Sequence, residues 1–158
     1  MGLEWMPGRR SGSHLNVTGP APLRPCVRAS RKMGIAQLKN AIPILDVRDM
    51  NRALGYYVEQ LGFQVEFRYE KDPSNYAGVV RDDVCLHMQW QHEDEFKKGA
   101  AGRLRVRIQV DNPDALFEEY RSKGVVSEGT GVRDTDWATR EFGFRDLDGN
   151  GLIFYRDL

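Results

Sequence analysis

Hydrophobic and polar positions alternate in recognisable periods from residue 40 onward. Residues 40–47 are mostly apolar, which predicts a strand, and Asp49 is placed to cap a helix that ends near Gly62. Residues 63–70 alternate apolar and polar side chains, which predicts a half-buried strand. The remaining predictions are strands over 76–81 and 84–90, a turn at 82–83, and a polar loop over 92–102.

The same order of elements starts again after residue 102. A strand is predicted over residues 103–110, and Asn112 followed by Pro113 predicts the start of a helix that ends at Gly124. The rest is predicted to contain a strand at 125–128, a loop at 129–136, strands at 139–145 and 152–156, and a turn at 148–150.

This restart is an internal repeat. Corresponding residues lie 62–64 positions apart, as in the pairs Val47 and Val110, Gly62 and Gly124, and Arg81 and Arg145. The pattern predicts an α+β fold of two tandem βαβββ modules, at about residues 40–91 and 103–157. We expect these modules to form a curved mixed sheet around a cavity, with the helices outside.

Residues 1–33 differ in composition from the rest and are predicted to be a disordered extension of the domain at 34–158. Gly, Pro, Ser and Arg dominate there, and apolar residues show no period. A secretory signal is disfavoured because the segment has no apolar stretch of about 7–15 residues. Two alternatives are a transit peptide, and sequence upstream of a natural start at Met33.

Charge and cysteine content limit the partners. Residues 33–158 carry 17 basic and 22 acidic side chains, a net charge of −5 that gives no reason to expect nucleic acid. No apolar run approaches the ~20 residues that span a bilayer, so no membrane partner is expected. Cys26 and Cys85 lie in segments of different character, so a disulfide is disfavoured and a cytoplasmic location is expected.

Strand faces indicate where a small molecule would bind. Arg105 and Arg107 alternate with apolar residues, as do His87 and Gln89, and we assign the apolar faces to the helices and the polar faces to the cavity. Aromatic rings near these faces could stack on a planar ligand, although most could equally be core. The predicted ligand-binding residues are Trp137, Phe142, Phe67, Tyr76, His87, Gln89, Arg105, Arg107 and Tyr155. Trp137 is the strongest single candidate because it precedes a strand in a loop rich in Gly and Asp.

Several sequence blocks carry a resemblance to a known superfamily. They are Ile42-Pro43-Ile44-Leu45, Leu61-Gly62-Phe63, residues 76–84, Trp137 with Arg140-Glu141-Phe142, and Asp146 with Gly149-Asn150. Through them the chain resembles the vicinal-oxygen-chelate superfamily of glyoxalase I, extradiol dioxygenases, fosfomycin-resistance transferases and bleomycin-resistance proteins. The bleomycin-resistance proteins are the most similar group. That resemblance implies a homodimer with two ligand crevices at its interface, in which the drug is sequestered and not modified.

The resemblance also raises the question of a metal. Superfamily enzymes hold a divalent cation with four His, Glu or Gln side chains, and the matching positions here are Ile42, His87, Arg105 and Ile153. Only His87 can donate to a metal, so no metal site, catalytic residue or cofactor is expected. The alternative for His87 is a polar residue that lines the cavity.

Three functions follow from these observations. The first is a non-catalytic protein that sequesters a bleomycin-type antibiotic and confers resistance; the drug is cationic with a planar tail, which suits a negative domain with aromatic rings. Arg105 and Arg107 would repel a cation unless acidic neighbours neutralise them. They favour the second function, a housekeeping binder of an unknown anionic metabolite. The third is a glyoxalase- or dioxygenase-type enzyme of the same superfamily.

Overall fold

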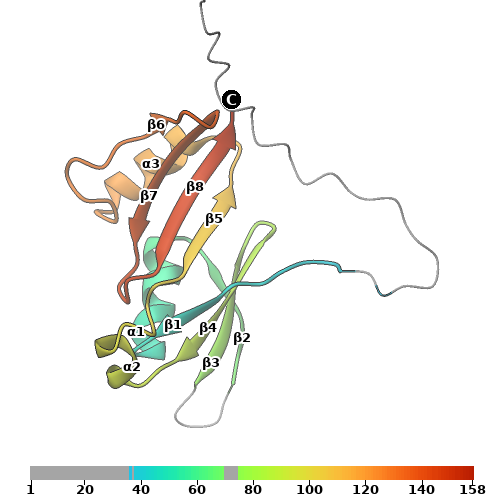
Figure 1. The fold of residues 1–158 in the computed structure, drawn as a ribbon, viewed down its shortest axis with the longest axis vertical. Coiled ribbons are helices and arrows are strands. Elements are labelled where there is room, and N and C mark those ends of the chain that lie inside the picture. The colour runs from blue at the N-terminus through green and yellow to red at the C-terminus, as the bar shows by residue number, and fades with distance from the viewer. Residues whose placement is uncertain (1–35, 37, 70–74) are drawn as a thin grey trace, which may run out of the picture.

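The computed structural model describes residues 36, 38–69 and 75–158 (Figure 1), so the extension predicted over residues 1–33 lies outside the described residues. The first half contains β1 (Ile44–Val47), α1 (Met50–Gly55), the π-helical turn η1 (Tyr56–Gln60), β2 (Gln64–Arg68), β3 (Tyr76–Arg81) and β4 (Val84–Trp90). A short helix, α2 (Glu93–Lys97), leads to the second half. That half contains β5 (Arg105–Gln109), α3 (Pro113–Ser122), β6 (Arg133–Asp134), β7 (Thr139–Arg145) and β8 (Gly151–Asp157).

The strands form two four-stranded sheets with the same topology. The strand order is β1-β4-β3-β2 in the first sheet and β5-β8-β7-β6 in the second. In each sheet one pair is parallel, β1 with β4 and β5 with β8, and the other pairs are antiparallel. The predicted α+β class with a repeated βαβββ order is therefore confirmed. Among the described residues the two sheets stay separate and do not close on each other.

Polar caps begin both long helical segments. Asp49 Oδ1 accepts a hydrogen bond of 3.0 Å from the N–H of Arg52, and Asn112 Oδ1 accepts one of 3.1 Å from the N–H of Ala115. The first helical segment ends before Gly62, whose φ of 75° favours glycine. In the part of the chain that the structure describes, no helix is long and apolar enough to cross a membrane.

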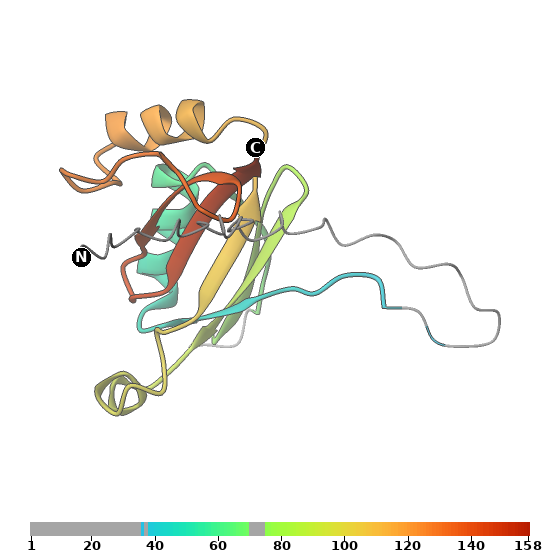
Figure 2. The same cartoon turned by 45° about the horizontal axis from the view of Figure 1, so that its top comes forward.

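The helices α1 and α3 each cover one face of a sheet, α1 on the first sheet and α3 on the second (Figures 1 and 2). On that side each strand contributes buried apolar residues: Leu45 and Val47 from β1, Leu86 and Met88 from β4, Val106 and Ile108 from β5, and Leu152 and Phe154 from β8. The assignment of the apolar strand faces to the helices is confirmed. The alternate residues of the same strands consequently form two polar faces on the other side.

Three predicted segments differ from the structure. The loop predicted over 92–102 contains α2, which begins with three acidic residues and is capped by His92, whose Nδ1 accepts from the N–H of Asp94 at 3.3 Å. Acidic residues favour a helix N-terminus, but a helix without an apolar stripe gives no periodic signal. The predicted strand at 125–128 is irregular, and the predicted loop at 129–136 contains β6.

The strand predicted over 63–70 has a bulge that the alternating pattern did not predict. The pairing of β2 with β3 shifts between Val65 and Phe67, so the two residues no longer share a face. Val65 is 46% exposed and Tyr69 is 58% exposed, so the prediction of a regular half-buried strand is wrong. The first predicted strand is also shorter than expected, because β1 begins at Ile44, after Pro43.

A buried hydrogen-bond network joins the two halves. The Asp146 carboxylate accepts from the Tyr57 hydroxyl at 2.9 Å, and from the N–H and side-chain amide of Asn150 at 2.8 and 2.9 Å. The same amide donates to the carbonyl of Asp46 at 2.9 Å. Burial, followed by the charge of Asp146, raises the pKa of Tyr57 well above its usual value. The Tyr57 hydroxyl therefore keeps its proton and donates across the contact between the halves.

In a second contact between the halves, the donor belongs to the second half and the acceptor to the first. The hydroxyl of Tyr120, in the second half, donates to the carbonyl of Leu61 at 3.3 Å. Arg81 at the end of β3 pairs with Glu119 of α3 at 2.8 Å. Tyr57 and Tyr120 are equivalent residues of the repeat, so each half sends one helical tyrosine to the other.

Replacing Asn150 with alanine tests how strongly the network holds the halves together. Asn150→Ala removes the donor to Asp46 and one donor to Asp146 in a fully buried position, so we expect unfolding free energy to fall by about 2–3 kcal/mol. Urea denaturation followed by circular dichroism measures this change. The exposed Asn75 serves as control, and Asn75→Ala should change stability by less than about 0.5 kcal/mol. Equal stability of the two variants would contradict a joining role for the network.

Candidate functional site

The polar face of the second sheet carries side chains in rows across β5, β8 and β7. The strand register aligns Arg105, Gly151 and Arg145 in one row. The next rows are Arg107, Ile153 and Gly143, followed by Gln109, Tyr155 and Glu141. Because alternate residues of a strand share a face, all three rows point away from the helices. This face therefore carries three arginines, two glycines and one aromatic ring.

Arg107 is neutralised within the face. Its guanidinium pairs with Glu141 at 3.0 Å and lies over the ring of Tyr155, 4.0 Å from the ring centroid. Glu141 is only 7% exposed and also accepts a hydrogen bond of 3.1 Å from the Thr139 hydroxyl. An ion pair and a cation–π contact together fix the side chain. Arg107 and Tyr155 thus form one flat, charge-compensated surface.

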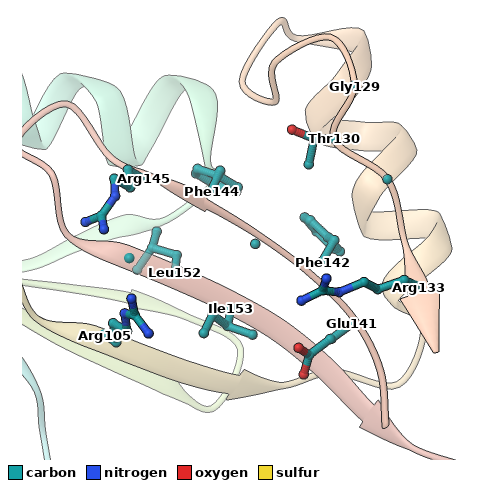
Figure 3. A pocket seen from close by; sticks show the side chains of 13 residues that line it. Arg105, Gly129, Thr130, Arg133, Glu141, Phe142, Phe144, Arg145, Leu152 and Ile153 are labelled. Atoms are coloured by element: carbon teal, nitrogen blue, oxygen red, sulfur yellow. The ribbon is translucent and has the colours of Figure 1, made fainter. Parts of the chain in front are cut away.

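Arg105 and Arg145 form a cationic pair on either side of Gly151. Neither guanidinium has a carboxylate partner among the described residues, and Arg145 donates only to the carbonyl of Gly149, at 2.6 Å. Both arginines line an open groove of about 470 Å³ that also takes its lining from β7, β8 and the loop at residues 129–131 (Figure 3). They also line a neighbouring hollow of about 530 Å³ with Arg48 and Arg103. Uncompensated guanidiniums beside a groove favour an anionic group there.

The polar face of the first sheet has aromatic and imidazole side chains. Phe67, Gly78 and His87 are aligned across β2, β3 and β4, and the Phe67 ring lies over Gly78, where a Cβ would come within 2.3 Å of it. Its edge meets His87 with the ring centroids 5.0 Å apart. The Tyr76 hydroxyl shares a hydrogen bond of 2.8 Å with Nδ1 of His87, and Gln89 lies beside Tyr76.

Glu66 and Cys85 extend this face, and neither is among the residues predicted to bind a ligand. The Cys85 thiol donates to Oε2 of Glu66 at 3.3 Å. Burial, followed by the hydrogen bond with Glu66, raises the pKa of Cys85. One donor atom each from Glu66, Cys85 and His87 lies within 4.8 Å of the other two. Strict alternation sets Glu66 and Phe67 on opposite faces, and only the bulge in β2 brings both to the polar side.

The nine predicted ligand-binding residues lie in four different places. Phe67, Tyr76, His87 and Gln89 lie on the first polar face, and Arg105, Arg107 and Tyr155 lie on the second. Trp137 is 41% exposed in the turn before β7. Phe142 is only 3% exposed and stacks on Phe154 in the core, 5.3 Å between centroids. Phe142 therefore serves packing against α3, and its ring is turned away from the polar face.

The residues at the superfamily metal positions do not fit a four-ligand site. The register sets Ile44 beside His87 and Arg107 beside Ile153, so the strand neighbours of His87 and Ile153 are two residues beyond the predicted Ile42 and Arg105. Ile42 itself precedes β1. With either choice His87 is the only metal donor of the four, because isoleucine has no lone pair and arginine stays protonated.

Comparisons with known proteins agree with the repeated βαβββ fold. The family model of the Glyoxalase/Bleomycin resistance protein/Dioxygenase superfamily matches residues 40–154. The chain is 26% identical over 132 residues to a bleomycin resistance protein of Geobacillus stearothermophilus, a match that covers 75% of this chain and 96% of that protein.

Two crystal structures show how far the similarity extends. The chain is 28% identical to the bleomycin-binding protein of bleomycin-producing Streptomyces verticillus, complexed with copper(II)-bleomycin; the TM-score is 0.61, and 76% of this chain and 97% of that chain are covered. A glyoxalase-related enzyme from Clostridium phytofermentans has a TM-score of 0.63 at 16% identity, covering 80% and 100% of the two chains. The second likeness shows the fold alone.

Substituting Gly78 tests the arrangement of the first polar face. In Gly78→Ala the new methyl group meets the Phe67 ring, so the ring must leave its position over β3 and its contact with His87. We expect a loss of about 1–3 kcal/mol in unfolding free energy. A shift of the His87 imidazole proton resonances in NMR spectra should accompany it. Gly131→Ala is the control, because nothing lies within 4 Å of a Cβ there; an unchanged His87 spectrum in Gly78→Ala would refute the arrangement.

Proposed function

Because the chain belongs to the Glyoxalase/Bleomycin resistance protein/Dioxygenase superfamily, we propose that it binds a bleomycin-type antibiotic and sequesters it without chemical change. The observation that carries this proposal is similarity over nearly the whole length of a bleomycin resistance protein and of a bleomycin-binding protein. The match covers 96% of a bleomycin resistance protein and 97% of a bleomycin-binding protein.

The side chains of the polar faces support the proposal. Tyr155 on the second sheet, and Phe67 and Tyr76 on the first, offer partly exposed rings on which a planar group can stack. Arg107 would repel a cationic drug, but its pairing with Glu141 compensates that charge. Binding through stacking and hydrogen bonds needs no reacting group, in keeping with a protein that holds the drug and leaves it intact.

The proposal includes a homodimer that is not an enzyme. The superfamily metal positions carry one donor, His87, so metal-assisted chemistry of the superfamily type lacks its ligand set. Both polar faces are open in a single chain, and Ile44 beside His87 is 44% exposed on one of them. A second copy packed across these faces would turn them into crevices. The free thiol of Cys85 suits a cytoplasmic protein.

Calorimetric titration of the full chain with metal-free and copper(II)-bleomycin tests the proposal. We expect one drug per chain with a dissociation constant on the order of 1 μM or tighter. Analytical ultracentrifugation of the same samples should give a dimer. The absence of heat, together with unchanged tryptophan emission on adding the drug, would overturn the proposal.

Two tryptophans provide a matched pair for locating the drug. Trp137 and Trp90 are 41% and 42% exposed, so their replacement by alanine removes similar surfaces. If Trp137 stacks on the drug, Trp137→Ala should weaken binding about tenfold, and Trp90→Ala should bind as the parent does. Equal affinities of the two variants would exclude Trp137 from the site without affecting the titration of the parent.

A second candidate function, the binding of an anionic metabolite, has one specific observation in its favour. The Arg105 and Arg145 guanidiniums flank Gly151 at the groove. Neither guanidinium pairs with a carboxylate among the described residues. Two such groups can hold a phosphate, sulfate or carboxylate through charge-assisted hydrogen bonds. On this alternative the natural ligand carries an anionic group over Gly151, and bleomycin is not the ligand.

Inorganic phosphate is a simple probe of this second candidate. We expect saturable shifts of the Gly151 amide resonance in NMR titrations, and about tenfold weaker binding in Arg105→Gln and in Arg145→Gln. Arg52→Gln removes an exposed arginine of α1 and serves as control. Shifts that do not saturate, or equal weakening in all three variants, would contradict an anion site at Gly151.

A further inference from the structure

We propose that Glu66, Cys85 and His87 form a binding site for one zinc-class divalent cation on the polar face of the first sheet. The three residues supply a carboxylate, a thiol and an imidazole, which are the donor types that Zn²⁺ and Co²⁺ bind in proteins. One donor atom from each lies within 4.8 Å of the others. No other group of three such residues lies as close among residues 36, 38–69 and 75–158.

The donors need little movement to meet a cation. With bonds of about 2.0–2.3 Å, ligand atoms around tetrahedral zinc lie roughly 3.3–3.8 Å apart. The Cys85 sulfur and Glu66 Oε2 already lie 3.3 Å apart, and the widest separation in the group is 4.8 Å at most. Changes of side-chain rotamer can close that gap, because Glu66 is exposed and the other two are half-buried. Three protein ligands leave the fourth position for water or for a bound molecule.

Two of the three metal-binding side chains come from β4, an inner strand of the first sheet. Cys85 and His87 are two residues apart on β4, so their side chains point to the same face of the sheet. The strand itself is held in place by pairing with β1 on one side and β3 on the other. The bulge between Val65 and Phe67 directs Glu66 toward Cys85.

Charge and second-shell contacts also suit a cation. In the metal-free chain the thiol proton lies between the Cys85 sulfur and the Glu66 carboxylate; binding would release this proton to solvent. The thiolate and carboxylate then carry two negative charges, which balance a divalent cation. The Tyr76 hydroxyl and Nδ1 of His87 are 2.8 Å apart, and in the tautomer in which Nδ1 donates to the Tyr76 hydroxyl the imidazole is oriented and the lone pair of Nε2 is free for a metal.

This site differs from the four-ligand site of superfamily enzymes. It takes all its ligands from the first sheet, and two of them, Glu66 and Cys85, lie outside the superfamily positions. The proposal is independent of the drug, because the cation alone is the ligand. A failure to bind metal would leave the sequestration proposal standing, and a failure to bind bleomycin would leave the metal site standing.

Titration of the reduced full chain with Co²⁺ tests the site. We expect one cobalt per chain, an absorption band from thiolate-to-cobalt charge transfer, and competition by Zn²⁺ that removes the band. Cys85→Ser should abolish the band, and Glu66→Gln and His87→Ala should weaken binding at least tenfold. Tyr76→Phe should weaken it about tenfold by releasing the imidazole. Affinity should fall as the pH falls, because the thiol must lose its proton.

Two control variants separate this site from the chain's other thiol and from a neighbouring histidine. Cys26→Ser removes the second cysteine of the chain, and His92→Ala removes an exposed imidazole in the turn before α2. Both should bind Co²⁺ as the parent does, and circular dichroism should show all variants folded. The proposal is overturned if Cys85→Ser keeps the band, if Cys26→Ser loses it, or if the parent binds no Co²⁺ at concentrations on the order of 100 μM.

Discussion

The buried carboxylate of Asp146 is the contact on which the geometry of both polar faces depends. It receives the Tyr57 hydroxyl from one half of the chain and the Asn150 backbone and side chain from the other. Buried polar groups are costly without partners, so these hydrogen bonds stabilise the relative placement of the halves that lets them form. The Oδ1 of Asn150 is buried without a partner among the described residues. The stabilising contacts of this side chain are therefore those that its NH₂ group donates to Asp46 and Asp146. Asp146 and Asn150, the first and last residues of the Asp-x-x-Gly-Asn sequence, thus hold the two βαβββ modules together.

With the halves fixed in this way, α1 and α3 lie on one side of the sheets and the two polar faces lie on the other. Within each face a glycine gives space to a large neighbour: the Phe67 ring lies over Gly78, and the stem of Arg105 passes 3.3 Å from where a Cβ of Gly151 would stand. Side chains from two or three strands can therefore approach each other across the intervening strand. The aromatic and imidazole cluster of the first sheet and the arginine pair of the second both follow from this spacing.

The sequence allowed the repeat, the helix caps and the strands β3, β4 and β7 to be predicted, because each depends on local patterns that repeat at a fixed offset. It also predicted which face of β4 and β5 is polar, and hence that His87 and Arg107 lie on the polar faces. One feature was not predictable from the alternation of apolar and polar residues: the bulge in β2 depends on how β3 pairs with it, and it decides the position of Glu66. Phe142 shares the apolar face of β7 with Phe144, so the same alternation places it in the core, where it contacts Phe117 and Phe154.

The two halves share one topology but differ in the chemistry of their polar faces. Ile44 beside His87 in the first sheet corresponds to Arg107 beside Ile153 in the second, so apolar and cationic side chains stand where a central metal would need lone pairs. Without a shared metal centre, the two faces differ in their side chains. The first face concentrates donors and aromatic rings around His87, and the second concentrates positive charge around Gly151. A ligand that spans both faces would need one part that stacks or coordinates and one part that is anionic. On the second face, the surface at Tyr155 is the part that does not repel a cation, because Glu141 compensates the charge of Arg107.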